Sequence, residues 1–213
     1  MKRFQWLRDV LAKDHARLEL VICTLQNECI QSQCSWDMSK LLDDWQHPIG
    51  GSGIAFFRPS PIFLPQYGVM PIYSIGHIAV AYFGVIDNIS EIREKFISSG
   101  VQFYSKNNVA ETLSHLLNHY LADGSLSPIE AMKVMMTKLK GNFAIMTLVK
   151  KGKWLMVGCR DYPLAVGHNN STVYFSTEPS TLTQFTPVRR SIFGKTKPEI
   201  FYATSGILVS DSR

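Results

Sequence analysis

The sequence predicts an α+β fold built as a sandwich of layers. After a short opening helix, the first part of the chain has mainly strand patterns, three amphipathic helical patterns follow between residues 89 and 141, and strand patterns separated by turn residues continue to about residue 209. Strands grouped apart from helices favour antiparallel sheets with helices on a face, whereas alternation of the two would favour a parallel sheet. The length of 213 residues suits one domain with a substantial core, so we expect a single domain over residues 1–213.

The first 60 residues combine short elements with glycine punctuation. Apolar residues recur at helical spacing from Phe4 to Leu11, which predicts an amphipathic helix. Residues 18–24 have a strand pattern, whereas residues 25–35 have no clear period and are expected to be a connection. A short helix is expected over 38–44, and the glycines within 50–53 then lead into another strand.

The middle of the chain holds a loop, a strand and a helix. Residues 60–74 are rich in proline, glycine and aromatic residues without periodicity, so we expect a loop of the kind that often frames a site. Residues 77–82 have a strand pattern. The helix after them can be capped by Asn88 or Ser90 and stops before Gly100. Its apolar face comprises Ile89, Ile92, Phe96 and Ile97.

Two further helices are predicted. The first spans about 109–122, and the second carries a strong start signal and extends to Gly141. At that start Ser127 can cap, Pro128 suits the first helical position and Glu130 can complete a capping box. The apolar faces are Leu113, Leu116, Leu117 and Tyr120 on the first helix, and Met132, Met135, Met136 and Leu139 on the second. We interpret the methionine face as core, with a groove for a partner as the alternative.

The last third of the chain has strand patterns. Four of them lie at 143–149, 154–159, 164–167 and 173–176. Gly152 lies between the first two and Asn169-Asn170 between the last two, which favours two hairpins. One or two more strands are expected within 189–209.

Composition and charge exclude several classes of protein. Hydrophobic residues make up 46% of the chain and charged residues 18%, which favours a globular protein over a disordered one. Without an apolar run long enough for a membrane span or a signal peptide, we expect a cytoplasmic protein with no membrane partner. The net charge of +5 is spread over separate segments rather than a basic stripe, so no nucleic-acid partner is expected.

No metal or cofactor is expected. The four cysteines are Cys23, Cys29, Cys34 and Cys159. No pair has zinc-knuckle spacing and a cluster of the first three lacks a fourth ligand at motif spacing, so we expect reduced thiols. His115 and His119 lie four residues apart on a predicted helix, but no third ligand follows at motif spacing. We therefore interpret both histidines as surface or packing residues.

Three segments carry a resemblance to a known family. They run from Gly50 to Arg58 (GGSGIAFFR), from His77 to Asn88 (HIAVAYFGVIDN) and from Arg160 to Gly167 (RDYPLAVG). Together they resemble the glutaminase domain of class II glutamine amidotransferases, most closely that of glucosamine-6-phosphate synthase. The resemblance implies an N-terminal-nucleophile hydrolase fold, a four-layer αββα sandwich in which two antiparallel sheets lie between helices.

The resemblance also implies which site positions persist. Arg58 matches the arginine that holds the glutamine carboxylate, and Gly84 matches the glycine of the oxyanion hole. Phe103 and Ser105 match the segment that leads to the amine-binding residue, near Asn108. Arg58, Gly84 and Asn108 are therefore candidate binding residues for a glutamine-like molecule or another carboxylate.

Several functional positions depart from the family pattern. The family nucleophile is an N-terminal cysteine, whereas this sequence starts with Met1 and Lys2, and the strand that would carry the nucleophile is expected to be missing. Phe83 stands where the family has the asparagine of the oxyanion hole. The aspartate expected to pair with the substrate amine is absent near residues 107–109. No catalytic residue is assigned.

These departures affect one mechanism, so we expect a degenerate domain without glutaminase activity. Its expected role is regulation or assembly of another protein, such as a synthase or isomerase subunit, and no sugar-isomerase half is expected in this chain. Two alternatives stay open. One is an active glutaminase half whose start lies upstream or whose missing parts come from another chain. The other is a carboxylate sensor in which Arg58 binds the carboxylate and the phenylalanines bind an apolar body.

Overall fold

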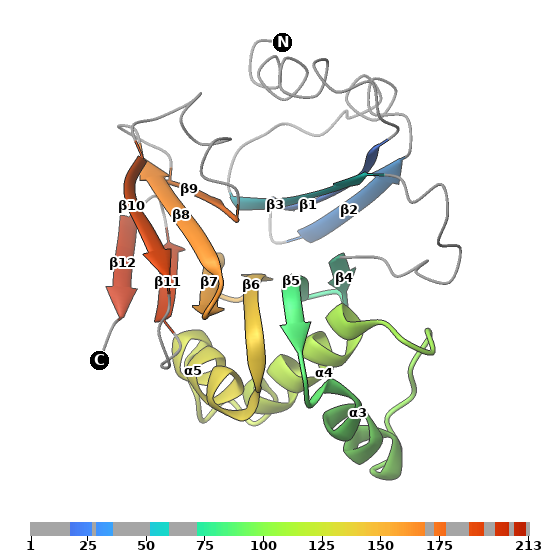
Figure 1. Ribbon diagram of the computed structural model, residues 1–213. Coiled ribbons are helices and arrows are strands. Elements are labelled where there is room, and N and C mark those ends of the chain that lie inside the picture. Colours follow the sequence, from blue (N-terminus) through green and yellow to red (C-terminus); the bar gives the residue numbers. More distant parts are fainter. Residues whose placement is uncertain are drawn as a thin grey trace.

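The computed structural model describes residues 18–26, 29–35, 52–59, 72–168, 173–177, 188–193, 199–204 and 207–211. Within them lie twelve strands and three helices (Figure 1). The strands are β1 (Leu18–Gln26), β2 (Cys29–Ser35), β3 (Ser52–Pro59), β4 (Ile72–Ser74), β5 (Ile78–Ile86), β6 (Gly141–Val149), β7 (Trp154–Arg160), β8 (Pro163–His168), β9 (Val173–Ser176), β10 (Val188–Phe193), β11 (Glu199–Thr204) and β12 (Ile207–Asp211). The helices are α3 (Ile89–Ser98), α4 (Val109–Leu121) and α5 (Pro128–Lys138).

A six-stranded antiparallel sheet in the order β12-β11-β7-β6-β5-β4 forms the centre of the described structure. Helix α4 packs on β4 and β5, and α5 packs on β7 and β11, so the helices cover one face (Figure 1). The described residues also form two three-stranded antiparallel sheets, β2-β1-β3 and β10-β8-β9. The predicted α+β sandwich is confirmed, while the helix expected over 4–11 lies outside the described residues.

Strand β5 lies between two apolar layers. Ile78 and Val80 belong to the core cluster shared with the helices. Ala79 and Ala81 belong to a second cluster, against which Ile30 of β2 packs. Because successive side chains of a strand point to opposite faces, the helices and the β2-β1-β3 sheet pack on opposite sides of β5. All four β5 residues are buried.

Three strand predictions are wrong. Residues 25–35 were expected to be a connection, but β2 pairs along its whole length with β1, from Gln26 opposite Cys29 to Leu20 opposite Ser35. Its sequence shows no apolar period, and the strand is recognised by its backbone pairing with β1 at one edge of the sheet as described. Of the expected loop 60–74, residues 72–74 form the short strand β4 and residues 60–71 lie outside the described residues. The expected one or two strands within 189–209 are three, β10, β11 and β12.

Helix α5 begins as the sequence predicts. The Ser127 side chain accepts a hydrogen bond from the Glu130 backbone N–H at 3.3 Å, and the Glu130 carboxylate accepts one from the Ser127 N–H at 2.8 Å. The helix ends at Lys138, three residues before Gly141. Its methionine face is core, since Met132, Met135, Met136 and Leu139 have no exposed surface. None of the described helices has the length and apolar character needed to cross a lipid bilayer.

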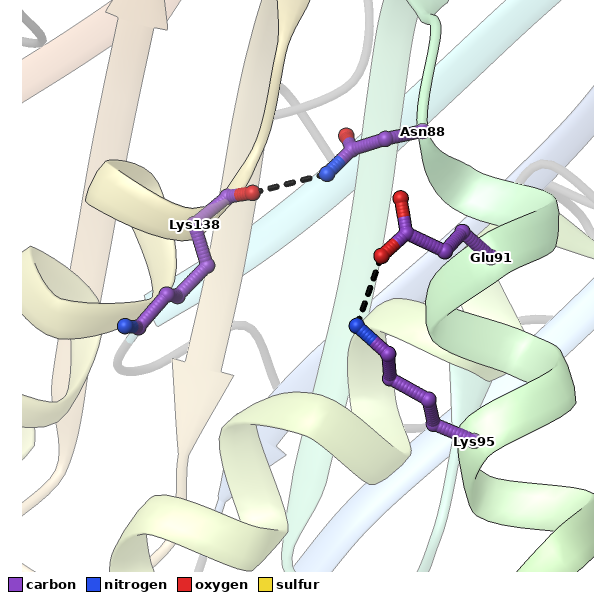
Figure 2. Close-up of polar contacts among 4 residues, drawn as sticks. All are labelled: Asn88, Glu91, Lys95 and Lys138. Carbon is purple, nitrogen blue, oxygen red and sulfur yellow. Dashed lines mark hydrogen bonds and ion pairs between the residues drawn. The ribbon is translucent and has the colours of Figure 1, made fainter.

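Asn88 does not cap α3 with its side chain, contrary to one of the two capping predictions. Its amide nitrogen donates to the Lys138 carbonyl oxygen at 2.8 Å, and its side-chain oxygen accepts from the Lys140 N–H at 2.8 Å. Figure 2 shows the first of these contacts beside the ion pair of Glu91 and Lys95. The side chain therefore joins the turn before α3 to the segment after α5.

Asn88→Ala is expected to lower the free energy of unfolding by about 1–2 kcal/mol, because two hydrogen bonds between distant segments are lost. Urea denaturation followed by circular dichroism measures this change. Glu91→Ala is the matched control, since Glu91 pairs with Lys95 on an exposed helix face where water screens the charges. Equal urea midpoints for the two variants would contradict a joining role for Asn88.

Candidate functional site

Gly84, near the end of β5, has a backbone geometry that requires glycine. Its φ angle is +96°, and it pairs with Phe143 of β6. A Cβ atom here would lie within contact distance of the Asn142 carbonyl oxygen and 2.9 Å from the Phe143 Cα. This strand therefore approaches β6 more closely than a side chain allows.

Two aromatic rings lie beside Gly84. The Phe83 and Tyr162 ring centroids are 5.6 Å apart at an interplanar angle of 55°. A Cβ on Gly84 would lie 3.0 Å from Tyr162 Cδ2, so the tyrosine ring also lies close to the glycine backbone. Phe83 is 40% exposed, so its ring lies partly open to solvent.

The turn between β7 and β8 positions Tyr162. Asp161 adopts a positive φ of 46°, which reverses the chain directly before Tyr162. The preceding residue, Arg160, donates from its guanidinium to the carbonyl oxygens of Leu139 and of Met136, the latter at 2.9 Å. Arg160 thus anchors the turn to the C-terminal end of α5, where a cation is favourable. Tyr162 was not among the predicted site residues, although it lies inside the segment from Arg160 to Gly167 that carries the family resemblance.

Arg58 lies in β3, opposite Glu19 of β1. Strand β3 packs against β6 and β7, so Arg58 and Gly84 lie in neighbouring sheets. The structure thus places the strand of Arg58 against β6 and β7, which belong to the same sheet as β5, the strand of Gly84. The role of Arg58 in binding a carboxylate stays a prediction.

The third candidate residue, Asn108, caps α4. It is 4% exposed, and its side-chain oxygen accepts a hydrogen bond from the Glu111 N–H at 3.1 Å. This satisfies one of the free N–H groups at the helix start. The Asn108 side chain therefore has a structural role at the start of α4, and its part in binding a ligand stays a prediction.

A buried carboxylate fixes the segment before α4. Glu111 has no exposed surface, and its carboxylate accepts hydrogen bonds from the Tyr104 N–H at 2.6 Å, the Ser105 N–H at 3.1 Å and the Ser105 hydroxyl at 2.8 Å. Three donors offset the cost of burying the charge. No local sequence signal indicates this role, because an acidic residue in the first turn is common on exposed helices.

Arg93 of α3 holds the same segment from the other side. Its guanidinium donates to the Ser105 carbonyl oxygen and, at 3.3 Å, to the Thr112 hydroxyl. It also lies 3.9 Å from the Phe103 ring centroid, which is a cation–π geometry. Residues 103–108 are therefore fixed by an acid and a base from two different helices.

The comparison with protein families agrees with this geometry. A family profile described as glutamine amidotransferase domain matches residues 60–184, which is more than half of the chain. This chain belongs to the glutamine amidotransferase domain family. Its matched region includes Phe83, Gly84, Asn108 and Tyr162.

Relatives of this amidotransferase domain are longer proteins. The chain is 31% identical over 140 residues to a glutamine–fructose-6-phosphate aminotransferase (isomerizing) of Bradyrhizobium diazoefficiens, covering 65% of this chain. It is 32% identical over 144 residues to the enzyme of the same name from Mesorhizobium japonicum, covering 66% of this chain. In both cases the match spans 23% of the relative.

Solved structures share the fold of this amidotransferase domain. The glutamine phosphoribosylpyrophosphate amidotransferase from B. subtilis, solved with ADP and GMP, aligns with a TM-score of 0.75 at 15% identity, covering 98% of this chain and 45% of that one. A structure described as the allosteric regulatory enzyme of purine biosynthesis aligns with a TM-score of 0.72 at 15% identity, covering 92% and 43%. The N-terminal-nucleophile amidotransferase fold implied by the resemblance is confirmed.

The amidotransferase domain has no metal-type cluster in its described part, since no group of three or more His, Cys, Asp or Glu side chains converges there. The His115 ring packs 4.8 Å from the Phe103 ring, and the His119 ring packs 5.9 Å from the Phe96 ring. Their predicted packing role is confirmed. Cys159 is buried and forms no disulfide bond, in line with the expected reduced thiol, while the side chains of the other cysteines lie outside the described part.

Proposed function

We propose that this amidotransferase domain does not hydrolyse glutamine and instead serves a regulatory or assembly role for another protein. The observation that carries the proposal is the Phe83–Tyr162 ring pair beside Gly84. The resemblance places an asparagine amide at residue 83, and a phenylalanine ring has no N–H to stabilise an oxyanion. Loss of one such donor costs about 2.7–4 kcal/mol in the transition state, or about 10²–10³ in kcat.

The segment before α4 supports the same proposal. Residues 107–109 are Asn, Asn and Val, so they offer no carboxylate to a substrate ammonium group. The nearby Glu111 carboxylate is engaged by three donors of the protein's own chain. An ammonium group that leaves water without an anionic partner loses its hydration uncompensated. Free glutamine is therefore a poor ligand for this site.

The role in assembly rests on the size of the relatives. Glutamine–fructose-6-phosphate aminotransferases match this chain over only 23% of their own length. A domain of this family thus occurs there together with much additional chain. We infer that the present domain associates with a synthase or isomerase subunit.

The proposal predicts that purified protein releases no ammonia from glutamine above a protein-free control. Ammonia is measured with a coupled assay, and intact-mass analysis defines the N-terminus of the protein assayed. An active glutaminase domain of an aminotransferase relative serves as the positive control. Glutamine-dependent ammonia release that Arg58→Ala abolishes, in a variant shown by circular dichroism to be folded, would overturn the proposal and favour an active glutaminase.

A thermal-shift screen with glutamine, other amino acids and simple carboxylates separates the regulatory role from a carboxylate sensor. The proposal predicts no shift that depends on Arg58. A shift lost in Arg58→Ala would favour the sensor. Assembly is tested by size-exclusion chromatography with an aminotransferase that lacks its own glutaminase domain. We expect the two proteins to elute together, and separate elution would contradict the assembly role.

A further inference from the structure

His115 lies in a ring cluster between α3, α4 and the segment before α4. Its imidazole is 4.8 Å from the Phe103 ring centroid and 6.4 Å from that of Phe96. Its Nε2 atom is buried and has no hydrogen-bond partner within the described residues. A neutral imidazole can place an unprotonated nitrogen there, whereas an imidazolium would bury an N–H donor without an acceptor.

Two charged side chains act on His115. Burial is the main cause that lowers the pKa of His115 below its ordinary value, and the Arg93 guanidinium of α3 lowers it further. Glu111, one turn earlier on α4, has the opposite effect. Arg93 already lies over the Phe103 ring, so a second cation against the same ring would be repelled. His119, one turn later, reaches the cluster through Phe96.

We propose that protonation of His115 releases the segment of residues 101–108 from α3 and α4, which makes this segment a pH-sensitive element of the domain. An imidazolium would draw the Glu111 carboxylate toward itself, in competition with the Tyr104 and Ser105 N–H groups that this carboxylate now binds. The charged His115 ring would also move out of its contact with the Phe103 ring. Both changes loosen the same segment.

The sign of the effect follows from the direction of the shift. Because the pKa of His115 is lower in the folded protein, the folded state favours the neutral imidazole. Protection of the segment is complete above the ordinary histidine pKa of about 6.5 and falls as the pH drops below it toward the folded-state value. The inference concerns the segment alone and holds whether or not the domain hydrolyses glutamine.

Amide hydrogen exchange of the full chain at pH 7.5 and pH 5.5, corrected for intrinsic rates, tests the inference. The reporters are the N–H groups of Val101, Tyr104 and Ser105, which bind Phe96 and Glu111. We expect a severalfold loss of their protection at pH 5.5, with β6 amides unchanged. His115→Phe keeps a ring and His115→Gln keeps a polar group, and both should remove the loss. His119→Phe, the matched control in the same cluster, should retain it.

The opposite results overturn the inference. These are no loss of protection in the native protein, an equal loss in β6, or a loss that persists in a folded His115 variant. Should neither variant fold, the native protein decides by NMR. The Tyr104 and Ser105 amide resonances must then shift with the same midpoint as the His115 ring resonance, and a different midpoint rejects the coupling.

Discussion

Gly84→Ala is expected to lower the free energy of unfolding by at least about 3 kcal/mol, which is a large fraction of the 5–15 kcal/mol typical of a domain. An alanine Cβ would collide with the Asn142 carbonyl oxygen and lie 2.9 Å from the Phe143 Cα. Both are backbone atoms of the central sheet, so relief requires moving β6 away from β5. The positive φ of 96° adds about 1 kcal/mol of conformational strain for a residue with a side chain.

Gly100→Ala separates these two causes. Gly100 has a similar φ of +89°, but a Cβ there would meet no atom within 4 Å. This control should therefore show only the cost of the backbone conformation. Urea denaturation of both variants gives the comparison. If Gly84→Ala is no less stable than Gly100→Ala, the result would contradict the close approach of the β5 and β6 backbones at Gly84.

Glu111→Ala is expected to lower the free energy of unfolding by about 3 kcal/mol or more. The substitution removes the charged acceptor of the Tyr104 N–H, the Ser105 N–H and the Ser105 hydroxyl, and a hydrogen bond to a charged group contributes about 1.5–3 kcal/mol. Hydrogen exchange should show the loss first at Tyr104 and Ser105.

Two variants test the specificity of this effect. Glu111→Gln keeps one oxygen acceptor at the same position, so its loss of stability should be smaller than that of the alanine variant. Glu94→Ala removes an exposed acid from α3 and should have little effect, since its charge is open to water. A result in which all three variants share one urea midpoint would mean that Glu111 does not hold the segment.

The predictable part of the fold is the part with strong local signals. The capping box at Ser127 and Glu130 and the buried methionine face define α5 without any knowledge of its neighbours. Hairpins such as β6–β7 follow from alternating apolar residues with a turn between them. Strand β2 was missed because pairing with β1, rather than its own periodicity, makes it a strand.

The candidate site was harder to predict, because its contacts join residues far apart in the chain. Gly84 and Asn108 were found through the resemblance, and the structure gives one a close strand contact and the other a helix cap. Tyr162 matters only because the β7–β8 turn brings it beside Phe83. Likewise, nothing in the local sequence of Glu111 indicates that it is fully buried.

The contacts of Asn88 have a consequence for the architecture of the chain. Helices α3, α4 and α5 leave the sheet after Ile86 and return to it at Gly141, and these two residues are paired in register. Asn88 ties the departing and returning chain together just outside that pair. The three helices thus form a connection between β5 and β6 whose two ends are held together, so its length does not change the alignment of these strands. Insertions in the exposed turn at residues 122–125 should therefore cost little folding stability and leave the pairing of the sheet unchanged.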